Sequence, residues 1–401
     1  MFYIQDSHFS QSLTAHEAIL TAATSSRNDT RNHGAGVFAF ATSGGVSLIF
    51  EDLILSDFLS KSPFTLIVGV DDVTNTYTLK KLCELRDLYC PNFVVKVFCH
   101  NDPKSIFHPK FVWFYVDGEI RLITGSGNLT EKGLRRNWEA FTISRLSGDE
   151  IEYFKNYWDS WIKENEGNLY DVDDEEVARQ AAKNNARVVA AGKSEVEPEG
   201  EEEVGSADDD VLAPERISQN GANRIESPSE VAVRKPLETE DYEAWTIEDH
   251  FEVLIAEIPN NGYRWKQANF NAGTFKGFFG GIAGGNVERR ILLRHVNMTG
   301  KLEDIEVRPT VSVKSKNYRV ELNAAAGLDY PNGEERPIGV FVKVSTRSFL
   351  YSLLMPDDVN YHEVLNYLDS SQPRIGNWMR RYLTNVEKLK ENCPSLGFWR
   401  M

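Results

Sequence analysis

Four side chains that suit phosphoryl transfer follow one another between positions 108 and 139: His108, Lys110, Asn128 and Glu139. An imidazole can attack phosphorus, while an ammonium and a carboxamide can neutralise and position the non-bridging oxygens of a phosphate. A carboxylate can orient the imidazole by accepting a hydrogen bond from its ring N–H. These residue types together predict the cleavage of a phosphoester bond.

Two β-prone runs, residues 109–116 and 120–124, are separated by Asp117-Gly118 and predict a β-hairpin. Asp-Gly between runs of aromatic and β-branched residues is a strong hairpin signal. Because residues two apart on a strand face the same side, we expect His108 and Lys110 to project together from the start of the first strand.

The antiparallel return of this hairpin brings a second group of polar residues back to the same end. Residues 125–128 read Gly-Ser-Gly-Asn and follow the second strand directly, so Asn128 is expected near His108 and Lys110. Glu139 begins a third β-prone run, residues 139–143. The sequence therefore predicts one site built from three adjacent β elements.

The order and spacing of these residues resemble the HxK…GSxN…E signature of the phospholipase D superfamily, and within it the nuclease branch that includes type II restriction endonucleases of the NgoFVII type. The resemblance covers roughly the first 165 residues. It implies that His108 attacks phosphorus to give a phosphohistidine, without a metal or another cofactor. It also implies that Lys110 and Asn128 bind the phosphate, that Glu139 is the partner of His108, and that Ser126 lies in the phosphate-facing turn.

One position departs from the superfamily pattern. The superfamily often has an aspartate five residues after the lysine, whereas this chain has Tyr115 there and Asp117 two residues later. Because that aspartate is largely structural, its absence argues against a lipase-type member more than against catalysis.

Each feature taken alone has an ordinary structural explanation. A single histidine at a strand start is more often a surface or core residue than a nucleophile, and a Gly-Ser-Gly exit can be turn chemistry alone. The agreement of four residue types in order and spacing is what favours catalysis.

Length and composition indicate a globular protein of two ordinary domains, since the chain has 401 residues. No apolar run is long enough to span a membrane, and the N-terminus lacks the pattern of a secretory signal, so we expect a cytoplasmic protein without a membrane partner. The four cysteines have neither paired nor metal-binding spacing, which predicts reduced thiols and no metal site.

The net charge of −16 is concentrated in the middle of the chain. Residues 171–250 carry 8 basic and 23 acidic side chains, whereas residues 251–401 carry 20 and 16. We therefore expect residues 167–249 to be an acidic, disordered linker, and the charge does not exclude DNA as a partner. A solvated spacer is the simpler role; the alternative is that residues 195–210 occupy the nuclease groove as a phosphate mimic.

Residues 1–166 are predicted to form an α/β domain with a mixed sheet flanked by helices. The expected strands are residues 36–42, 64–70 and 92–100, and the expected helices are residues 46–59, 78–88 and 149–164. The last helix would close the domain, with its aromatic stripe in the core or in a dimer contact.

Residues 250–401 are predicted to form a β-rich domain, because short strands are separated by turns rich in Gly, Asn and Pro. The expected strands are residues 288–296, 306–313, 318–322, 338–344 and 348–355. NgoFVII-type enzymes place a pseudobarrel DNA-recognition domain in this position, so the resemblance implies that this domain binds DNA. The candidate DNA-binding residues are Arg264, Lys266, Arg294, Arg308, Lys314, Lys316 and Arg319.

The HxK element occurs only once in the chain. This chemistry normally uses two histidines, one that attacks and one that protonates the leaving oxygen. We therefore expect a homodimer with the active site at its two-fold interface.

The sequence as a whole predicts a metal-independent DNA endonuclease that acts on double-stranded DNA in restriction or phage defence. Two alternatives stay open: a phosphodiesterase for substrates other than nucleic acids, and a DNA-binding protein with an inactive nuclease domain. The sequence does not reveal a target site or whether a partner ATPase or methyltransferase exists.

Overall fold

Successive residues on the strands of the N-terminal half pack into different apolar clusters, so the sheet is covered on both faces. On β3 (Phe64–Gly69), Leu66 and Val68 belong to one core cluster, whereas Ile67 belongs to another. Alternating side chains of a strand point to opposite faces, which explains the division. The computed structural model describes residues 1–9, 11–26, 31–100, 105–194, 245–260, 262, 265–281, 289–309, 319–332 and 335–401.

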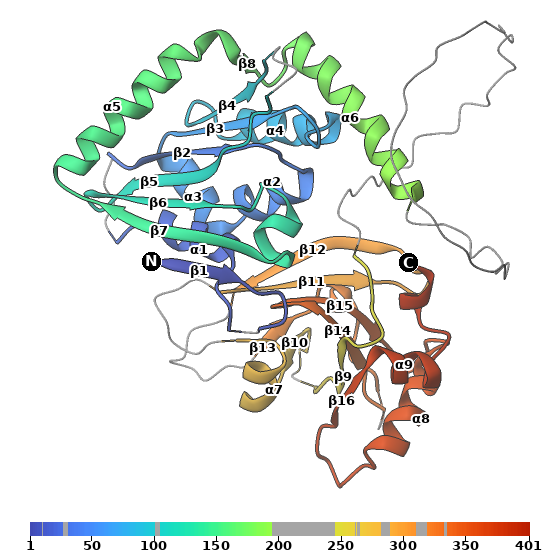
Figure 1. Cartoon of the computed structure of the whole chain (residues 1–401). Helices are drawn as coiled ribbons and strands as arrows, with labels where there is room; N and C mark the ends of the chain where they lie inside the picture. Colours follow the sequence, from blue (N-terminus) through green and yellow to red (C-terminus); the bar gives the residue numbers. More distant parts are fainter. Residues whose placement is uncertain are drawn as a thin grey trace, which may run out of the picture.

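Within the described residues, the N-terminal sheet is mixed and has eight strands in the order β1-β7-β6-β5-β2-β3-β4-β8 (Figure 1). Besides β3, its strands are β1 (Phe2–Gln5), β2 (His33–Phe38), β4 (Phe93–Phe98), β5 (Lys110–Val116), β6 (Glu119–Gly125), β7 (Glu139–Leu146) and β8 (Leu169–Asp171). β3 pairs in parallel with β2 and β4, and the other neighbours are antiparallel. The predicted mixed sheet flanked by helices is confirmed.

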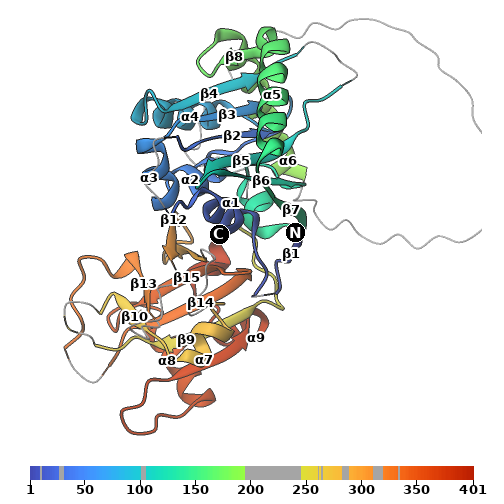
Figure 2. The same ribbon diagram turned by 90° about the vertical axis from the view of Figure 1, so that its left-hand side faces the viewer.

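The helices divide between the two faces of this sheet. One face is covered by α1 (Ala15–Ala23), α2 (Ser43–Phe50), α3 (Leu53–Lys61) and α4 (Thr76–Leu88), and the other by α5 (Asp149–Glu164); Figure 2 shows α5 opposite α2, α3 and α4. The single helix predicted over residues 46–59 is in fact two helices. Asp52 separates them, because its carboxylate accepts a hydrogen bond from the Ile54 amide and caps α3.

The N-terminal unit continues beyond residue 166, where the sequence suggested that a linker begins. β8 pairs with β4, and the helix α6 (Glu175–Ser194) packs Val177 and Ala181 into the main core cluster. Asn184 donates hydrogen bonds to the carbonyls of Val70 and Thr74. The acidic residues 195–210 lie outside the described residues.

The C-terminal half is rich in β-structure, as predicted. In the part of this half that the structure describes, a six-stranded sheet has the order β12-β11-β15-β14-β9-β16, and β10 pairs with β13. The strands are β9 (Glu252–Glu257), β10 (Gln267–Asn269), β11 (Arg290–Val296), β12 (Leu302–Pro309), β13 (Arg319–Glu321), β14 (Ile338–Ser345), β15 (Ser348–Leu354) and β16 (Arg381–Asn385), and the helices are α7 (Ala272–Gly277), α8 (Tyr361–Ser371) and α9 (Val386–Asn392). The comparison with a pseudobarrel stays a prediction.

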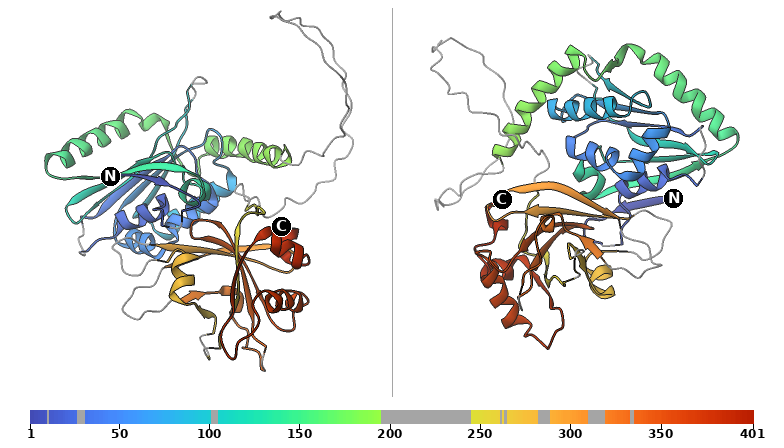
Figure 3. Two further views of the ribbon diagram at one scale, coloured as in Figure 1. Left: turned by 60° about the horizontal axis from the view of Figure 1, so that its bottom comes forward. Right: turned by 180° about the vertical axis from the view of Figure 1, so that it is seen from behind.

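The two halves share a packed interface. Figures 1 and 3 show β11 and β12 beside the N-terminal unit, on the side of the sheet that α1 to α4 cover. Leu292, Ile305 and Val307 pack against the main N-terminal core cluster, and the Arg290 guanidinium binds both oxygens of Asp52 at 2.8 and 3.1 Å. Among the described residues, no helix combines the length and the apolar character needed to cross a membrane.

Candidate active site

The predicted hairpin is present and consists of β5 and β6. Asp117 and Gly118 form its turn, with φ angles of 55° and 86°. The Asp117 carboxylate accepts hydrogen bonds from Ser25, Ser26 and Arg121. Burial opposes ionisation here, but these hydrogen bonds outweigh it and lower the pKa of Asp117. Asp117 therefore fixes the far end of the hairpin and is not part of the candidate site.

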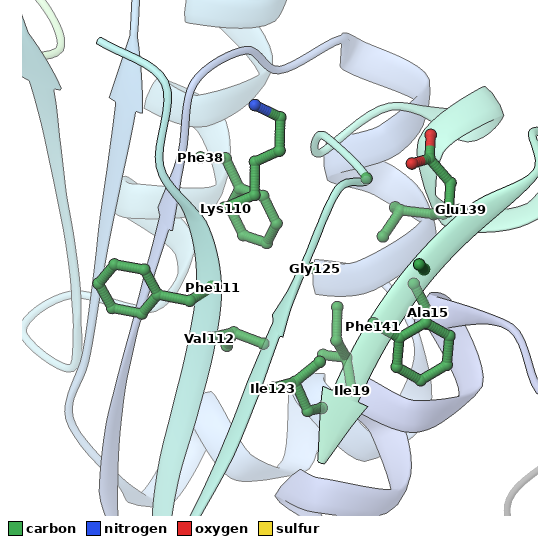
Figure 4. Close-up of a pocket in the computed structure, with 13 residues that line it drawn as sticks. Ala15, Ile19, Phe38, Lys110, Phe111, Val112, Ile123, Gly125, Glu139 and Phe141 are labelled. Carbon is green, nitrogen blue, oxygen red and sulfur yellow. The ribbon is translucent and has the colours of Figure 1, made fainter. Parts of the chain in front are cut away.

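Lys110 and Glu139 lie on either side of the same small pocket. Figure 4 shows both side chains reaching toward its polar end, Lys110 from the start of β5 and Glu139 from the start of β7. Gly125 and Gly127 line the pocket between them, and apolar residues such as Ile19 and Ile123 form the rest of its wall. Burial lowers the pKa of the Lys110 ammonium, while Glu139 opposes that shift.

Glu139 is held by two polar neighbours. Its Oε2 accepts a hydrogen bond from Ser126 Oγ, and its Oε1 accepts one from Asn137 Nδ2 at 3.2 Å. Ser126 Oγ also accepts a hydrogen bond from the Ala140 amide at 3.0 Å. The structure therefore brings Lys110, Ser126 and Glu139 together, as the sequence predicted.

His108 is exposed and lies just before β5, so strand alternation does not set its direction. Its ring meets Phe40 edge-on at a centroid distance of 5.9 Å, and its carbonyl accepts a hydrogen bond from Lys110 Nζ at 3.1 Å. The His108 side chain lines a second pocket of about 410 Å³, together with Trp158 and Trp161. The expected contact between His108 and Glu139 is not formed here and stays a prediction that depends on rotation of the ring.

Asn128 lies where the chain crosses to the end of β2. The next residue forms an isolated bridge with Ala41, and its amide donates a hydrogen bond to the Phe40 carbonyl at 3.1 Å. The Asn128 Oδ1 is buried without a hydrogen-bond partner within the described residues. Since buried polar atoms are almost always paired, a ligand or a turned carboxamide would satisfy this site.

A close backbone contact holds Asn128 in place. The segment after it forms η1, one turn of π-helix (Lys132–Arg136). A Cβ on Gly133 would lie 2.7 Å from the carbonyl oxygen of Asn128 and 2.8 Å from its nitrogen, so only glycine permits this approach. π-Helical turns are frequent at functional sites, but their sequence signal is weak, and the prediction did not include η1.

Gln5 is a positioning residue that the sequence prediction missed. It is fully buried and donates hydrogen bonds to the carbonyls of Gly133 and Asn137, at 3.2 and 2.9 Å. Its Oε1 accepts a hydrogen bond from the Ala15 amide at 2.8 Å. Gln5 therefore joins β1, α1 and η1, and no local pattern around it signals this role.

The predicted DNA-binding residues divide into separate groups. Lys266, Arg308 and Arg319 gather at β13: Lys266 Nζ lies 3.2 Å from Glu321 Oε1, and Arg308 donates to the Glu321 carbonyl. Arg319 donates to the side chains of Gln267 and Asn269. Arg294 lies apart from them, over the Trp245 ring. Arg264, Lys314 and Lys316 lie outside the described residues.

No family model and no curated protein matches this sequence. Among solved structures, the chain is similar to Nuc of Salmonella typhimurium, a phospholipase D family member (17% identity, 43% of this chain and 97% of that chain, TM-score 0.30). It is also similar to NucT of Helicobacter pylori (11% identity, 39% and 87%, TM-score 0.26) and to the phosphatidylserine synthase of Haemophilus influenzae (12% identity, 48% and 46%, TM-score 0.29). Each of these TM-scores is below 0.5.

Proposed function

We propose that this protein is a metal-independent phosphodiesterase that cleaves DNA through a phosphohistidine at His108. The observation that carries the proposal is that Lys110 and Glu139 line the polar end of one pocket, with Ser126 hydrogen-bonded to Glu139. Lys110 lies two residues from His108 along the chain. An ammonium and hydrogen-bond donors beside a candidate nucleophile suit stabilisation of a phosphoryl transition state.

The proposed reaction has two steps. In the first, a neutral His108 imidazole forms a bond to phosphorus while the bond from phosphorus to the leaving oxygen breaks, and that oxygen receives a proton. In the second, water attacks the phosphohistidine, loses a proton and releases the imidazole. Lys110, Asn128 and Ser126 would bind the non-bridging oxygens, and Glu139 would orient His108 once the ring turns toward it.

A second copy of the chain is proposed to supply the proton for the leaving oxygen. The chain has one HxK element, whereas this reaction normally uses two histidines, one that attacks phosphorus and one that protonates the leaving oxygen. The exposed position of His108 is compatible with a two-fold axis that places the partner's histidine opposite it.

DNA is the proposed substrate, and restriction or phage defence is the proposed context. The support is the resemblance of the HxK…GSxN…E pattern to nucleases and the group of basic side chains at β13 of the C-terminal half. This group would contact phosphates and bases, with the C-terminal half choosing the target.

Cleavage of plasmid and phage DNA in the presence of EDTA tests the proposal. We expect the wild-type protein to cut, the His108→Ala variant to be inactive, and the His362→Ala variant to cut like wild type, because His362 is an exposed histidine on α8. Cleavage that disappears with EDTA, or that persists in His108→Ala, would overturn the mechanism. Cleavage of bis(p-nitrophenyl) phosphate without cleavage of DNA would keep the chemistry and reject the substrate.

A further inference from the structure

Residues 126–139 form the catalytic segment, which carries Ser126, Asn128 and Glu139 and has η1 at its centre. Arg135 in η1 does not face the pocket but is fully buried at the interface with the C-terminal half. Its Nη2 donates to three backbone carbonyls there: Arg290 at 3.0 Å, Thr346 at 3.2 Å and Arg347 at 3.0 Å. The C-terminal half is therefore hydrogen-bonded to the middle of the catalytic segment.

The other side of the Arg135 guanidinium is bound by α1. Its Nη1 donates to Thr14 Oγ1 at 3.3 Å and to Glu17 Oε1 at 3.2 Å. Glu17 is also fully buried, and it binds Arg347 through both carboxylate oxygens, at 2.8 and 2.6 Å. Burial alone would raise the pKa of Glu17, but Arg347 and Arg135 outweigh it and hold that pKa below its ordinary value.

Contacts within the segment connect Arg135 to the candidate catalytic residues on both sides. On the Asn128 side, the backbone of Gly133 packs so closely against the backbone of Asn128 that no Cβ would fit between them. Toward Glu139, the Asn137 amide donates to the Lys132 carbonyl at 2.8 Å, and Asn137 Nδ2 donates to Glu139. A displacement of η1 therefore moves both the amide and the carboxylate of the site.

We propose that Arg135 is a positioning residue through which the docked C-terminal half holds Asn128 and Glu139 in their catalytic arrangement. The inference rests on the proposed phosphodiesterase function for its effect on rate, but its effect on the segment's geometry is independent of the reaction. It makes the C-terminal half a structural part of the active site as well as the proposed DNA-binding unit.

A matched control separates the proposed positioning role of Arg135 from a general contribution of this interface to stability. Asp52 is also buried at this interface, where its carboxylate binds Arg290, but it lies at the start of α3 and not in the catalytic segment. Asp52→Asn weakens the ion pair with the Arg290 side chain and leaves in place the Arg290 carbonyl that Arg135 binds, whereas Arg135→Met removes the hydrogen bonds that link η1 to the C-terminal half. Arg135→Lys is the milder variant, since it keeps a positive charge beside Glu17 and loses the array of donors to the carbonyls.

The experiment compares full-length wild type, Arg135→Met, Arg135→Lys and Asp52→Asn with two readouts. The first is amide hydrogen exchange of peptides from residues 126–139. The second is kcat and KM for bis(p-nitrophenyl) phosphate, which is too small to reach the proposed DNA-binding residues of the C-terminal half. We expect both Arg135 variants to exchange faster in this segment and to lose about 100-fold in kcat with little change in KM. Asp52→Asn should match wild type both in the hydrogen exchange of this segment and in kcat.

The outcomes separate this inference from the proposed function. Faster exchange in a protein whose wild type hydrolyses nothing would support the role of Arg135 and reject the phosphodiesterase. Unchanged exchange and kcat in both Arg135 variants, with an active wild type, would overturn the role of Arg135 and keep the phosphodiesterase. Equal losses in the Arg135 variants and Asp52→Asn would reduce Arg135 to an ordinary interface residue.

Discussion

At the scale of single residues, burial and neighbouring charge prepare Lys110 for its proposed role. Desolvation lowers the pKa of its ammonium, and the Glu139 carboxylate opposes that change. A partly desolvated cation binds a phosphate oxygen more strongly than an exposed one, because less water screens it. The same pair defines the polar end of the pocket in Figure 4.

Replacement of Lys110 by Met is expected to lower kcat/KM for DNA by about 100-fold or more, the usual effect of removing one group that stabilises transition-state charge. Lys96→Met is the matched control, because Lys96 pairs with Asp171 elsewhere on the same sheet. Steady-state kinetics of the two variants provide the measurement. Similar activities of Lys110→Met and wild type would remove Lys110 from the site.

His16 makes stability depend on pH. It is fully buried on α1, neither ring nitrogen has a hydrogen-bond partner in the described residues, and burial with the nearby Arg135 lowers its pKa from 6.5 to about 3. The unfolded chain binds a proton near pH 6.5 that the folded protein takes up only near pH 3. This contribution to stability is therefore complete above pH 6.5 and is lost as the pH falls toward 3.

Urea unfolding at pH 7 and pH 5 tests this dependence. Wild type should lose about 2 kcal/mol between the two pH values through His16, since 1.5 pH units separate pH 5 from the ordinary histidine pKa. His16→Leu should lose correspondingly less because it has no group to protonate. Equal losses in the two proteins would show that His16 does not titrate as its burial implies.

The sequence predicted the residue types of the site better than their contacts. Lys110, Ser126 and Glu139 come together because hairpin geometry fixes the ends of β5, β6 and β7. The direction of His108 was not predictable, because it precedes the strand and no alternation governs it. Gln5 and Arg135 were missed because their contacts join segments more than a hundred positions apart.

At the scale of elements, local signals gave the hairpin and the boundaries of α5, Asp149–Glu164, as predicted. They did not give β1, whose sequence Phe-Tyr-Ile-Gln does not alternate between apolar and polar residues, or β9, which is almost wholly buried and shows no period of two. The N-terminal edge of the sheet was therefore missing from the prediction, although β1 pairs directly with β7 and carries Gln5.

The contact between η1 and Asn128 can be tested through Gly133. In Gly133→Ala, the added Cβ would meet two backbone atoms of Asn128 at 2.7 and 2.8 Å, and neither can move aside alone. We expect a loss of about 1–3 kcal/mol in stability from overpacking, and a fall in kcat of at least about tenfold. Thermal unfolding and kinetics measure the two effects.

Gly167→Ala serves as the control for this substitution, because a Cβ at Gly167 meets nothing within 4 Å. It should keep wild-type activity and stability. An active and stable Gly133→Ala would mean that η1 does not hold Asn128 in place.

At the scale of the whole molecule, the buried ionic cluster at the interface escaped sequence analysis. Glu17 binds Arg347 across 330 positions of the chain, and Arg290 binds Asp52 across 238. In the sequence, Arg290 and Arg347 look like the other basic residues of the β-rich half. No local pattern distinguishes an arginine that is buried in an ion pair from one that contacts DNA. Composition did predict two globular halves with an acidic stretch between them, but not where the first half ends.

The proposed homodimer predicts a particle of two 45.5 kDa chains in light scattering. It also predicts that a mixed dimer of wild type and His108→Ala is inactive, because each cleavage uses one histidine to attack and the other to protonate the leaving oxygen. Titration of His108→Ala into wild type, with subunit exchange, should lower activity more than simple dilution does. A fully active monomer would exclude the shared site.

The most direct test of the central claim is the stereochemical course of hydrolysis at phosphorus, measured in isotopically labelled water with DNA that carries one phosphorothioate of defined configuration at a cleaved position. Attack by His108 followed by attack by water inverts phosphorus twice, so the account predicts overall retention of configuration. Inversion would mean that water attacks the phosphodiester directly, and it would contradict a phosphohistidine intermediate at His108.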